Sequence, residues 1–332
     1  MGALMLFRGW IEEKGRVLAP TEVVELTPGR LCRCGGEFVL ATDRVIARDR
    51  YGIMPGEITP GVIQSPERDW QIIPDVPDLS LEDAVLEAVR LRCDDSGTAS
   101  VVTLSGGVDS TLIAVLADLP CIAVGFSGSH DLTAAIDAAD RLDLSLTVCE
   151  ITEDDLINGL SLVRAALLNA SLMDIELALV DYFIGRTAKA CGAEKVLTGQ
   201  AADELFGGYT RYGRSCNLRA DLDADFTGLA IQRVRGSTAV GLSGVWYSMP
   251  YMDERVVRVS RKFANEELVA SNLRKIALRK VAMKYLPEDL AWKPKKAMQY
   301  GSGITAALRR VEPNSQRRAS CAWLSDDSCM KK

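Results

Sequence analysis

From residue 99 to about residue 200 this chain alternates short apolar runs with longer segments of helical periodicity. Such alternation is typical of a parallel β-sheet whose strands are connected by helices that cover it. It predicts an α/β fold, a parallel sheet flanked by helices. The expected strands are 100–105, 121–126, 145–151 and 195–199, and the expected helices are 109–118, 131–142, 154–169 and 174–191.

The flanking segments have different patterns. The first 75 residues are rich in turn signals, with short strand-like runs at 38–42 and 45–48, which predicts a small β-rich region. After residue 200 the pattern is mostly helical, so we expect a helical C-terminal part with a long amphipathic helix over 266–285.

A linker is expected between the first two regions. Residues 73–80 contain two prolines, which interrupt regular structure, and Ser80 with Asp83 can cap the helix that follows. We therefore expect two domains, residues 1–75 and 76–332.

The composition is that of a globular protein, since 48% of the 332 residues are hydrophobic and 25% are charged. No apolar run is long enough to cross a membrane, and the N-terminus lacks a signal-peptide pattern, so we expect a cytoplasmic protein with no membrane partner. The net charge of −6 argues against nucleic acid as a partner, because phosphate binding needs a clustered basic surface.

The cysteines and the basic residues near the C-terminus offer no strong site of their own. Nine cysteines without a C-x-x-C pair favour reduced thiols, and Cys32 and Cys34 have no second pair to complete a metal site. Positive charge gathers late in the chain, where the arginines suit a solvated helix face and the lysines could contact phosphate. These residues are Lys293, Lys295, Lys296, Arg309, Arg310, Arg317 and Arg318.

The strongest motif is TLSGGVDSTL at residues 103–112, where an apolar strand turns into a helix. Its two glycines allow a tight turn that brings backbone N–H groups close to a ligand, and the following helix N-terminus favours an anion. Asp109 would repel a phosphate unless a divalent cation bridges the two. The motif is neither a Walker-type phosphate loop nor a dinucleotide loop. We expect a phosphate-binding turn, the alternative being a plain strand-to-helix turn with a capping aspartate.

A second motif, TGQAADELFGGYTRY at residues 198–212, follows the last apolar strand. It should lie at the carboxyl edge of the sheet, where open α/β sheets bind ligands. Asp203 and Glu204 place two carboxylates at that edge. From the residues alone, they could equally serve the first turn of the short helix that follows, where acids are favoured.

Together these motifs resemble those of the asparagine synthetase and β-lactam synthetase family, in the superfamily of ATP pyrophosphatases. The first is similar to the pyrophosphate loop, and the second to the signature S-G-E-G-x-D-E-L-F-G-G-Y. The resemblance covers about residues 80–305. Three more segments are similar to family segments: 122–142 to the stretch that wraps the nucleotide, YSMPYMD (247–253) to V-P-F-L-D, and 286–304 to the late segment with a catalytic lysine.

The resemblance implies that ATP and Mg²⁺ are the cofactors. It assigns Asp109 and Asp203 to the metal, and Lys295 to the stabilisation of charge at the α-phosphate, with Lys296 as the alternative register. Without the motif, Lys295 would be read as a solvated surface lysine. The implied ATP-binding residues are Leu104, Ser105, Gly106, Gly107, Asp109, Ser110, Val124, Thr198 and Gly199.

The N-terminal region departs from the family pattern. Residue 2 is glycine where glutamine-using members have a catalytic cysteine, so we do not expect glutamine hydrolysis. Residues 41–58, ATDRVIARDRYGIMPGEI, are nevertheless similar to a stretch of the family's glutaminase domain. The first 75 residues thus resemble a shortened, inactive remnant of that domain.

Two further departures concern the acid substrate. Gln200 stands where the family has a catalytic glutamate, and an amide cannot carry charge or take a proton. Residues 170–179 lack the arginine expected near an acidic substrate and carry Asp174 and Glu176 instead. Aspartate is therefore in question as the substrate, and a less acidic or amine-bearing acid fits better.

The resemblance implies an AMP-forming carbon–nitrogen ligase that adenylates a small carboxylate such as aspartate and passes the acyl group to ammonia or an amine. The nitrogen would come from free ammonia or from a separate amidotransferase. Two alternatives stay open. One is a tRNA- or cofactor-modifying enzyme that uses the same adenylation, and the other is a non-catalytic nucleotide-binding protein, which Gln200 would suit.

Overall fold

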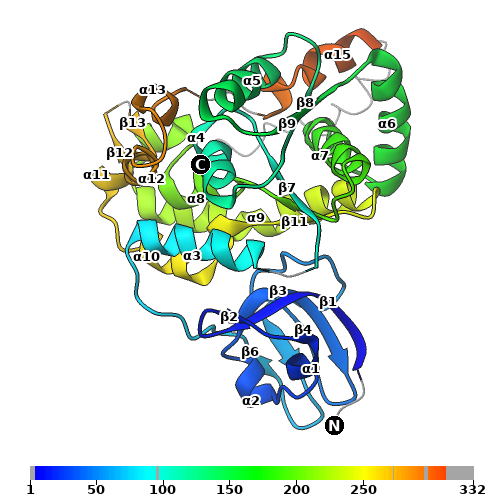
Figure 1. Ribbon diagram of the computed structural model, residues 1–332, viewed down its shortest axis with the longest axis vertical. Helices are drawn as coiled ribbons and strands as arrows, with labels where there is room; N and C mark the ends of the chain where they lie inside the picture. The colour runs from blue at the N-terminus through cyan, green and yellow to red at the C-terminus, as the bar shows by residue number, and fades with distance from the viewer. Residues whose placement is uncertain (1–3, 95–96, 272, 295–297, 312–332) are drawn as a thin grey trace, which may run out of the picture.

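The computed structural model describes residues 4–94, 97–271, 273–294 and 298–311. An antiparallel sheet formed by the first part of the chain lies below a larger α/β body (Figure 1). Its strand order is β2-β1-β3-β4-β5-β6, and the short helices α1 (Pro20–Val23) and α2 (Pro28–Leu31) precede β3. The strands are β1 (Leu4–Glu13), β2 (Arg16–Val17), β3 (Gly35–Thr42), β4 (Ile46–Arg48), β5 (Val62–Gln64) and β6 (Trp70–Gln71).

The expected β-rich region is confirmed: the expected strand 38–42 lies within β3, and the expected strand 45–48 overlaps β4. The ten-residue strand β1 was not expected, because its buried residues do not alternate with exposed ones. Trp10, Ile11 and Glu12 are all buried. Ile11 belongs to the core of the antiparallel sheet, whereas Trp10 packs in a cluster with Trp246 of the α/β body. Burial on both faces hides the period of two that identifies a strand.

The α/β body contains a five-stranded parallel sheet with the order β11-β10-β7-β8-β9. Helices α4 (Val108–Ala117) and α5 (His130–Leu142) pack against β7 and β8. Helices α7 (Leu172–Ala190) and α9 (Leu218–Gly241) pack against the sheet after the chain has crossed to its other face. Strands β8 and β10 are fully buried, as is usual for parallel strands covered on both faces. The strands are β7 (Ser100–Thr103), β8 (Cys121–Gly125), β9 (Leu146–Glu150), β10 (Lys195–Leu197) and β11 (Trp246–Ser248).

The expected fold class and the four expected strands and helices of this region are confirmed. The helices are α4 (Val108–Ala117), α5 (His130–Leu142), α6 (Glu153–Ala166) and α7 (Leu172–Ala190). Helix α3 (Leu81–Cys93) begins as expected at Ser80, whose hydroxyl accepts from the Asp83 N–H at 3.1 Å. Ser171 caps α7 in the same way, and there the Asp174 side chain also accepts from the Ser171 N–H, which completes a capping box.

The expected helix over 266–285 is wrong. This stretch contains α11 (Asn265–Leu268), a hairpin of β12 (Val269–Ala270) and β13 (Leu273–Arg274), and then α12 (Ile276–Ala282). Ser271 and Lys275 adopt left-handed φ values of 54° and 57°, which break a helix. The apolar residues of this stretch are nevertheless spaced as in a helix, because α11 and α12 each bury an apolar face.

The remaining elements complete the helical C-terminal part. No described helix combines the length and the apolar character that a membrane span requires. These elements are α8 (Ala202–Phe206), the 3₁₀ turn η1 (Thr210–Arg214), α9 (Leu218–Gly241), the 3₁₀ turn η2 (Pro250–Met252), α10 (Glu254–Ser260), α13 (Glu288–Ala291), α14 (Met298–Gly301) and α15 (Ile304–Val311).

Candidate active site

The strand order places the two sequence motifs beside each other. Strand β7 lies between β10 and β8, so the chain leaves β7 toward one side of the sheet and later returns to form β10 on the other. Open α/β sheets bind ligands at such a switch point, at the carboxyl ends of the strands. The loops after β7 (residues 104–107) and after β10 (residues 198–201) both lie there.

The loop after β7 forms a turn that opens into the N-terminus of α4. Gly106 has a left-handed φ of 68°, and Gly107 is the N-cap residue of α4 but provides no side-chain cap. The Ser105 N–H donates to Ser110 Oγ at 3.1 Å, and the two hydroxyl oxygens lie 2.9 Å apart. N–H groups of an uncapped first turn are suited to bind an anion. Leu104 is buried, and its N–H pairs with the Ile122 carbonyl of β8 at 2.9 Å.

The loop after β10 is held against this turn. Thr198 is buried, and its N–H donates to the Ser248 carbonyl at 3.0 Å. The Gln200 N–H donates to the Thr198 hydroxyl at 3.2 Å. Gly199 packs directly on Asp109 and Ser110. The structure therefore brings together the predicted residues of both motifs.

A buried lysine joins the two predicted metal-binding acids. Lys275 Nζ lies 2.6 Å from Asp109 Oδ2 and 2.6 Å from Asp203 Oδ1. Lys275 and Asp109 are 3% and 2% exposed. Three elements distant in sequence, namely the starts of α4, α8 and α12, thus place two carboxylates around one cation. The two carboxylates offset the cost of burying the Lys275 ammonium group.

Lys275 was missed by the sequence reading, which placed it inside the expected long helix. Its left-handed backbone at the N-cap position of α12 turns the side chain away from any helix face, and strained backbone of this kind is common at functional sites. The surrounding stretch LRKIALRK (273–280) holds four basic residues in eight positions, so no local signal in the sequence distinguishes Lys275 from its neighbours.

Gly208 provides the space for this arrangement. A Cβ at this position would lie 1.7 Å from Asp203 Oδ1 and 2.3 Å from Lys275 Cε. The second glycine of the DELFGG motif is therefore required for the ion pair to form. Arg274 holds the same segment by donating to the Gly208 carbonyl at 2.8 Å.

Two buried groups lie beside the charged centre. Tyr251 of η2 donates its hydroxyl to the Asp109 carbonyl at 3.1 Å. Glu204, next to Asp203, accepts from the Tyr209 hydroxyl at 2.5 Å. Burial raises the pKa of Glu204 to about 7, with a further contribution from the negative charge of Asp203. Both acids lie in the first turn of α8, whose N-cap residue is Ala201.

Other predicted residues have different surroundings. Lys295 and Lys296 lie outside the described residues, whereas Lys293 pairs with Asp137 at 2.9 Å. Asp174 caps α7 and pairs with Arg235 at 3.1 Å, so its charge is already engaged. Val124 is buried in β8, one residue before the carboxyl end of the strand.

The cysteines and the surface charges carry no second site in the described parts of the chain. Burial raises the pKa of Cys34 to about 12, which keeps its thiol protonated. Among the described residues, no three His, Cys, Asp or Glu side chains converge as a metal site.

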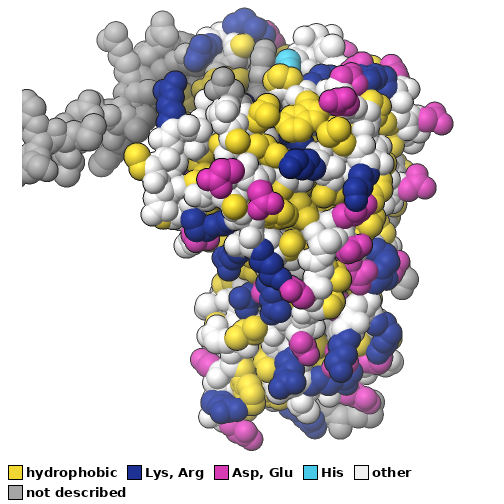
Figure 2. Space-filling model, turned by 90° about the vertical axis from the view of Figure 1, so that its left-hand side faces the viewer, with side chains coloured by type: hydrophobic (Ala, Val, Ile, Leu, Met, Phe, Trp, Pro, Cys, Tyr) yellow, Lys and Arg dark blue, Asp and Glu magenta, His cyan; other side chains and the backbone are white. Residues whose placement is uncertain are grey.

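On the face that Figure 2 shows, basic and acidic side chains are interspersed. Arg310 pairs with Glu153 at 2.9 Å, whereas Arg317 and Arg318 lie outside the described residues.

The sequence of this chain is similar to those of known asparagine synthetases. The family model described as asparagine synthase matches residues 80–238 and 229–320. A putative glutamine-hydrolyzing asparagine synthetase of Methanocaldococcus jannaschii is 33% identical over 288 residues, covering 74% of this chain and 52% of its own. Asparagine synthetase B of Escherichia coli is 26% identical over 338 residues, covering 92% of this chain and 58% of its own. The chain thus spans little more than half the length of these relatives.

Among solved structures, a U34-tRNA thiolase from Methanococcus maripaludis has a TM-score of 0.35 and 14% identity, covering 74% of this chain and 78% of its own. A likeness of that size carries no weight for function.

Proposed function

We propose that this chain, which belongs to the asparagine synthase family, is an ATP-dependent synthetase that adenylates a small carboxylate and forms an amide from ammonia or an amine. The observation that supports this most strongly is the convergence of Asp109 and Asp203 on Lys275 at the switch point of the sheet. The family is one of AMP-forming carbon–nitrogen ligases, and Asp109, Asp203 and Lys275 are charged groups that suit such chemistry.

The proposed reaction has two steps. A carboxylate oxygen attacks the α-phosphorus of ATP, and the bond to the β-phosphate breaks to release pyrophosphate. The nitrogen of ammonia or an amine then attacks the acyl carbon, loses a proton to solvent, and displaces AMP. Both steps build negative charge on phosphate oxygens, which fixed donors and cations stabilise.

Each part of the site has a role in this scheme. The N–H groups of residues 106–108 and the Ser105 hydroxyl bind the phosphates at the N-terminus of α4. Leu104, Val124, Thr198 and Gly199 would border the nucleotide. Lys275 supplies a positive charge that does not depend on a bound metal, and Lys295 remains our proposal for the second cation, at the α-phosphate.

The two acids also fit a magnesium ion. They already lie around a single cation, at 2.6 Å each, and two carboxylates are the usual protein share of a Mg²⁺ shell that phosphate oxygens and water complete. The bound ion would neutralise phosphate charge. Lys275 would then have to release at least one carboxylate when Mg²⁺ and ATP bind.

The acid and nitrogen substrates are proposed from the side chains near the site. Gln200 cannot act as a base, so it would orient the carboxylate by hydrogen bonds alone. Asp174 is engaged by Arg235 and does not offer a free charge to a substrate amine. We therefore treat aspartate as one of several candidate carboxylate substrates. Free ammonia or an amidotransferase partner is the nitrogen source that we propose.

The test is pyrophosphate release from Mg-ATP by the whole chain, with a panel of carboxylates and either ammonium or glutamine. We expect release with ammonium and one acid of the panel. Lys275→Met should abolish release, Lys295→Ala should lower it strongly, and Lys280→Met, an exposed lysine of the same helix, should leave it unchanged. ATP binding without release for every acid would instead favour a non-catalytic nucleotide-binding protein.

A further inference from the structure

A buried carboxylate of the antiparallel sheet binds the end of a strand of the parallel sheet. Glu37 of β3 is 0% exposed. It accepts hydrogen bonds from Ser248 Oγ at 2.6 Å and from the Met249 N–H at 2.9 Å, both at the carboxyl end of β11. It also pairs with Arg92 Nε at 2.8 Å. Glu37 thus connects two sheets that share no backbone hydrogen bond.

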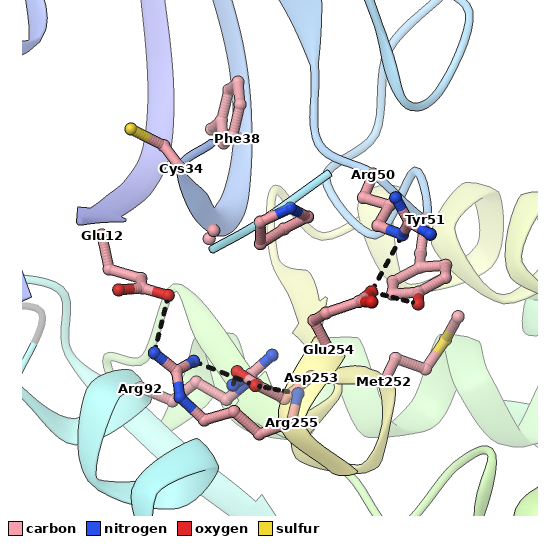
Figure 3. Close-up of a pocket in the computed structure, with 13 residues that line it drawn as sticks. Glu12, Cys34, Phe38, Arg50, Tyr51, Arg92, Met252, Asp253, Glu254 and Arg255 are labelled. Carbon is pink, nitrogen blue, oxygen red and sulfur yellow. Dashed lines mark hydrogen bonds and ion pairs between the residues drawn. The ribbon is translucent and has the colours of Figure 1, made fainter. Parts of the chain in front are cut away.

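The surrounding boundary is closed by charge pairs. Arg92 contacts Asp253 at 3.0 Å, and Arg255 contacts both Asp253 at 3.1 Å and Glu12 of β1 at 2.9 Å. Figure 3 shows these groups facing one another across the boundary. They border a cavity of about 20 Å³, room for roughly one water molecule. Since every one of these side chains is buried, the end of β11 cannot move without breaking paired charges.

Two short routes lead from the end of β11 into the candidate active site. The Ser248 carbonyl accepts from the Thr198 N–H at 3.0 Å, and the Thr198 hydroxyl holds the Gln200 N–H. Directly after β11, η2 carries Tyr251, whose hydroxyl donates to the Asp109 carbonyl at 3.1 Å. Tyr251 is fully buried and packs edge-to-face on Phe206 of α8.

We infer that Glu37 and Tyr251 are positioning residues for the ATP-binding turn, and that the antiparallel sheet is an integral part of the synthetase site. Glu37 holds the end of β11 and therefore η2. Tyr251 then fixes the first turn of α4, which carries Asp109 and closes the loop around Ser105. This inference rests on the proposed function only in that the turn binds ATP.

The expected effects follow from the strength of one buried hydrogen bond. Loss of the Tyr251 hydroxyl lets the first turn of α4 shift, which should weaken Mg-ATP binding by about fivefold to tenfold. Glu37→Gln keeps the shape of the side chain but removes its charge and one acceptor oxygen. It should weaken ATP binding in the same direction, while the KM of the carboxylate substrate stays unchanged.

The experiment is a double-mutant cycle on the whole chain, comprising Glu37→Gln, Tyr251→Phe and the double variant. Tyr51→Phe is the matched control, since the Tyr51 hydroxyl donates across the same boundary at 2.6 Å, but to Glu254 of α10 and not to β11 or η2. The Kd of Mg-ATP is measured by calorimetry, KM and kcat by pyrophosphate release, and Tm by thermal unfolding.

We expect both single variants to raise the Kd and KM of ATP, the double variant to resemble the weaker-binding single variant, and Tyr51→Phe to bind ATP like the wild type. A lower Tm with unchanged ATP binding in Glu37→Gln would overturn the inference. The inference would also be overturned if the double variant raised the Kd of ATP by the product of the two single effects, because the two residues would then act independently. If the wild-type protein binds ATP but releases no pyrophosphate, only the proposed function is refuted, because the Kd values of the double-mutant cycle still test the positioning role. If the wild-type protein does not bind ATP, both the proposed function and this inference are refuted.

Discussion

Two buried charge clusters in this molecule differ in how they meet solvent. At the boundary between the sheets, Glu12, Glu37, Arg92, Asp253 and Arg255 are each at most 6% exposed and point at one another. At the carboxyl edge of the parallel sheet, the Asp203 side chain is 23% exposed and the cluster borders loops that end in uncapped helix N-termini.

This difference in exposure indicates that the boundary cluster stabilises the fold, whereas the cluster at the edge of the sheet is available to a ligand. The boundary groups are buried and paired with one another, so replacing one leaves another charged and buried. The edge groups include a lysine held by two acids, an arrangement that can open when a more strongly charged ligand arrives. Substitutions in the boundary cluster should therefore lower stability, and substitutions in the edge cluster should lower activity.

The largest expected effect on stability is at the boundary. Glu12→Ala removes one of the two carboxylate partners of Arg255 and the acceptor of the Gly15 N–H. Because Glu12 and Arg255 are both buried, water cannot replace the lost carboxylate, and the free energy of unfolding should fall by about 3–5 kcal/mol. Glu82→Ala, which removes a surface partner of Lys284, should cost less than about 1 kcal/mol. Urea denaturation measures both, and equal losses would contradict the distinction.

The opposite result is expected for Asp203→Asn. Pyrophosphate release should fall by about 10²–10³-fold, because a group that organises charge at the phosphates is lost. The free energy of unfolding should change by less than about 1 kcal/mol, since Lys275 keeps Asp109 as a partner and Asp203 is partly exposed. Parallel activity assays and denaturation curves test this, and a large loss of stability would place Asp203 with the structural cluster.

A third prediction concerns the phosphate-binding turn. At Gly106 the φ is 68° and an added Cβ would lie 2.3 Å from the Ala134 carbonyl, so Gly106→Ala should reduce ATP affinity by at least about tenfold. Gly192 has a similar φ of 77° but open space around it. Gly192→Ala should cost about 1 kcal/mol of stability and no ATP affinity. Calorimetric titration with Mg-ATP distinguishes the two, and equal affinities would reject the turn as the ATP site.

The smallest effect is a pH dependence at Glu204. Burial raises its folded-state pKa from the ordinary 4.5 to about 7, so between these values the folded chain binds the proton more tightly than the unfolded chain does. Stability from this group is therefore present at low pH and is lost as pH rises, by about 1.5 kcal/mol between pH 5.5 and 7. Glu204→Gln should flatten this slope in urea titrations at several pH values; an unchanged slope would assign it to other groups.

Much of the parallel sheet was predictable because its signals are local. Apolar runs and helical periods gave β7 to β10 and α4 to α7, and the two loop motifs gave Asp109 and Asp203. Strand β11 has only three residues and follows a long helix, so it had no pattern of its own. The amphipathic period at 266–285 was misleading, because two left-handed residues interrupt a helix without changing the spacing of apolar side chains.

The sequence by itself determined the α/β class, the order of the elements and the identity of the turn residues, since strand period, helix period and glycine placement act over a few neighbouring residues. Only the tertiary structure decided that Lys275, 166 positions after Asp109, is the cation between the two acids. It alone also brought Glu37 to the end of β11, 211 positions away. Ion pairs and hydrogen bonds depend on distances between atoms that only the packed chain brings together, and no local pattern encodes them.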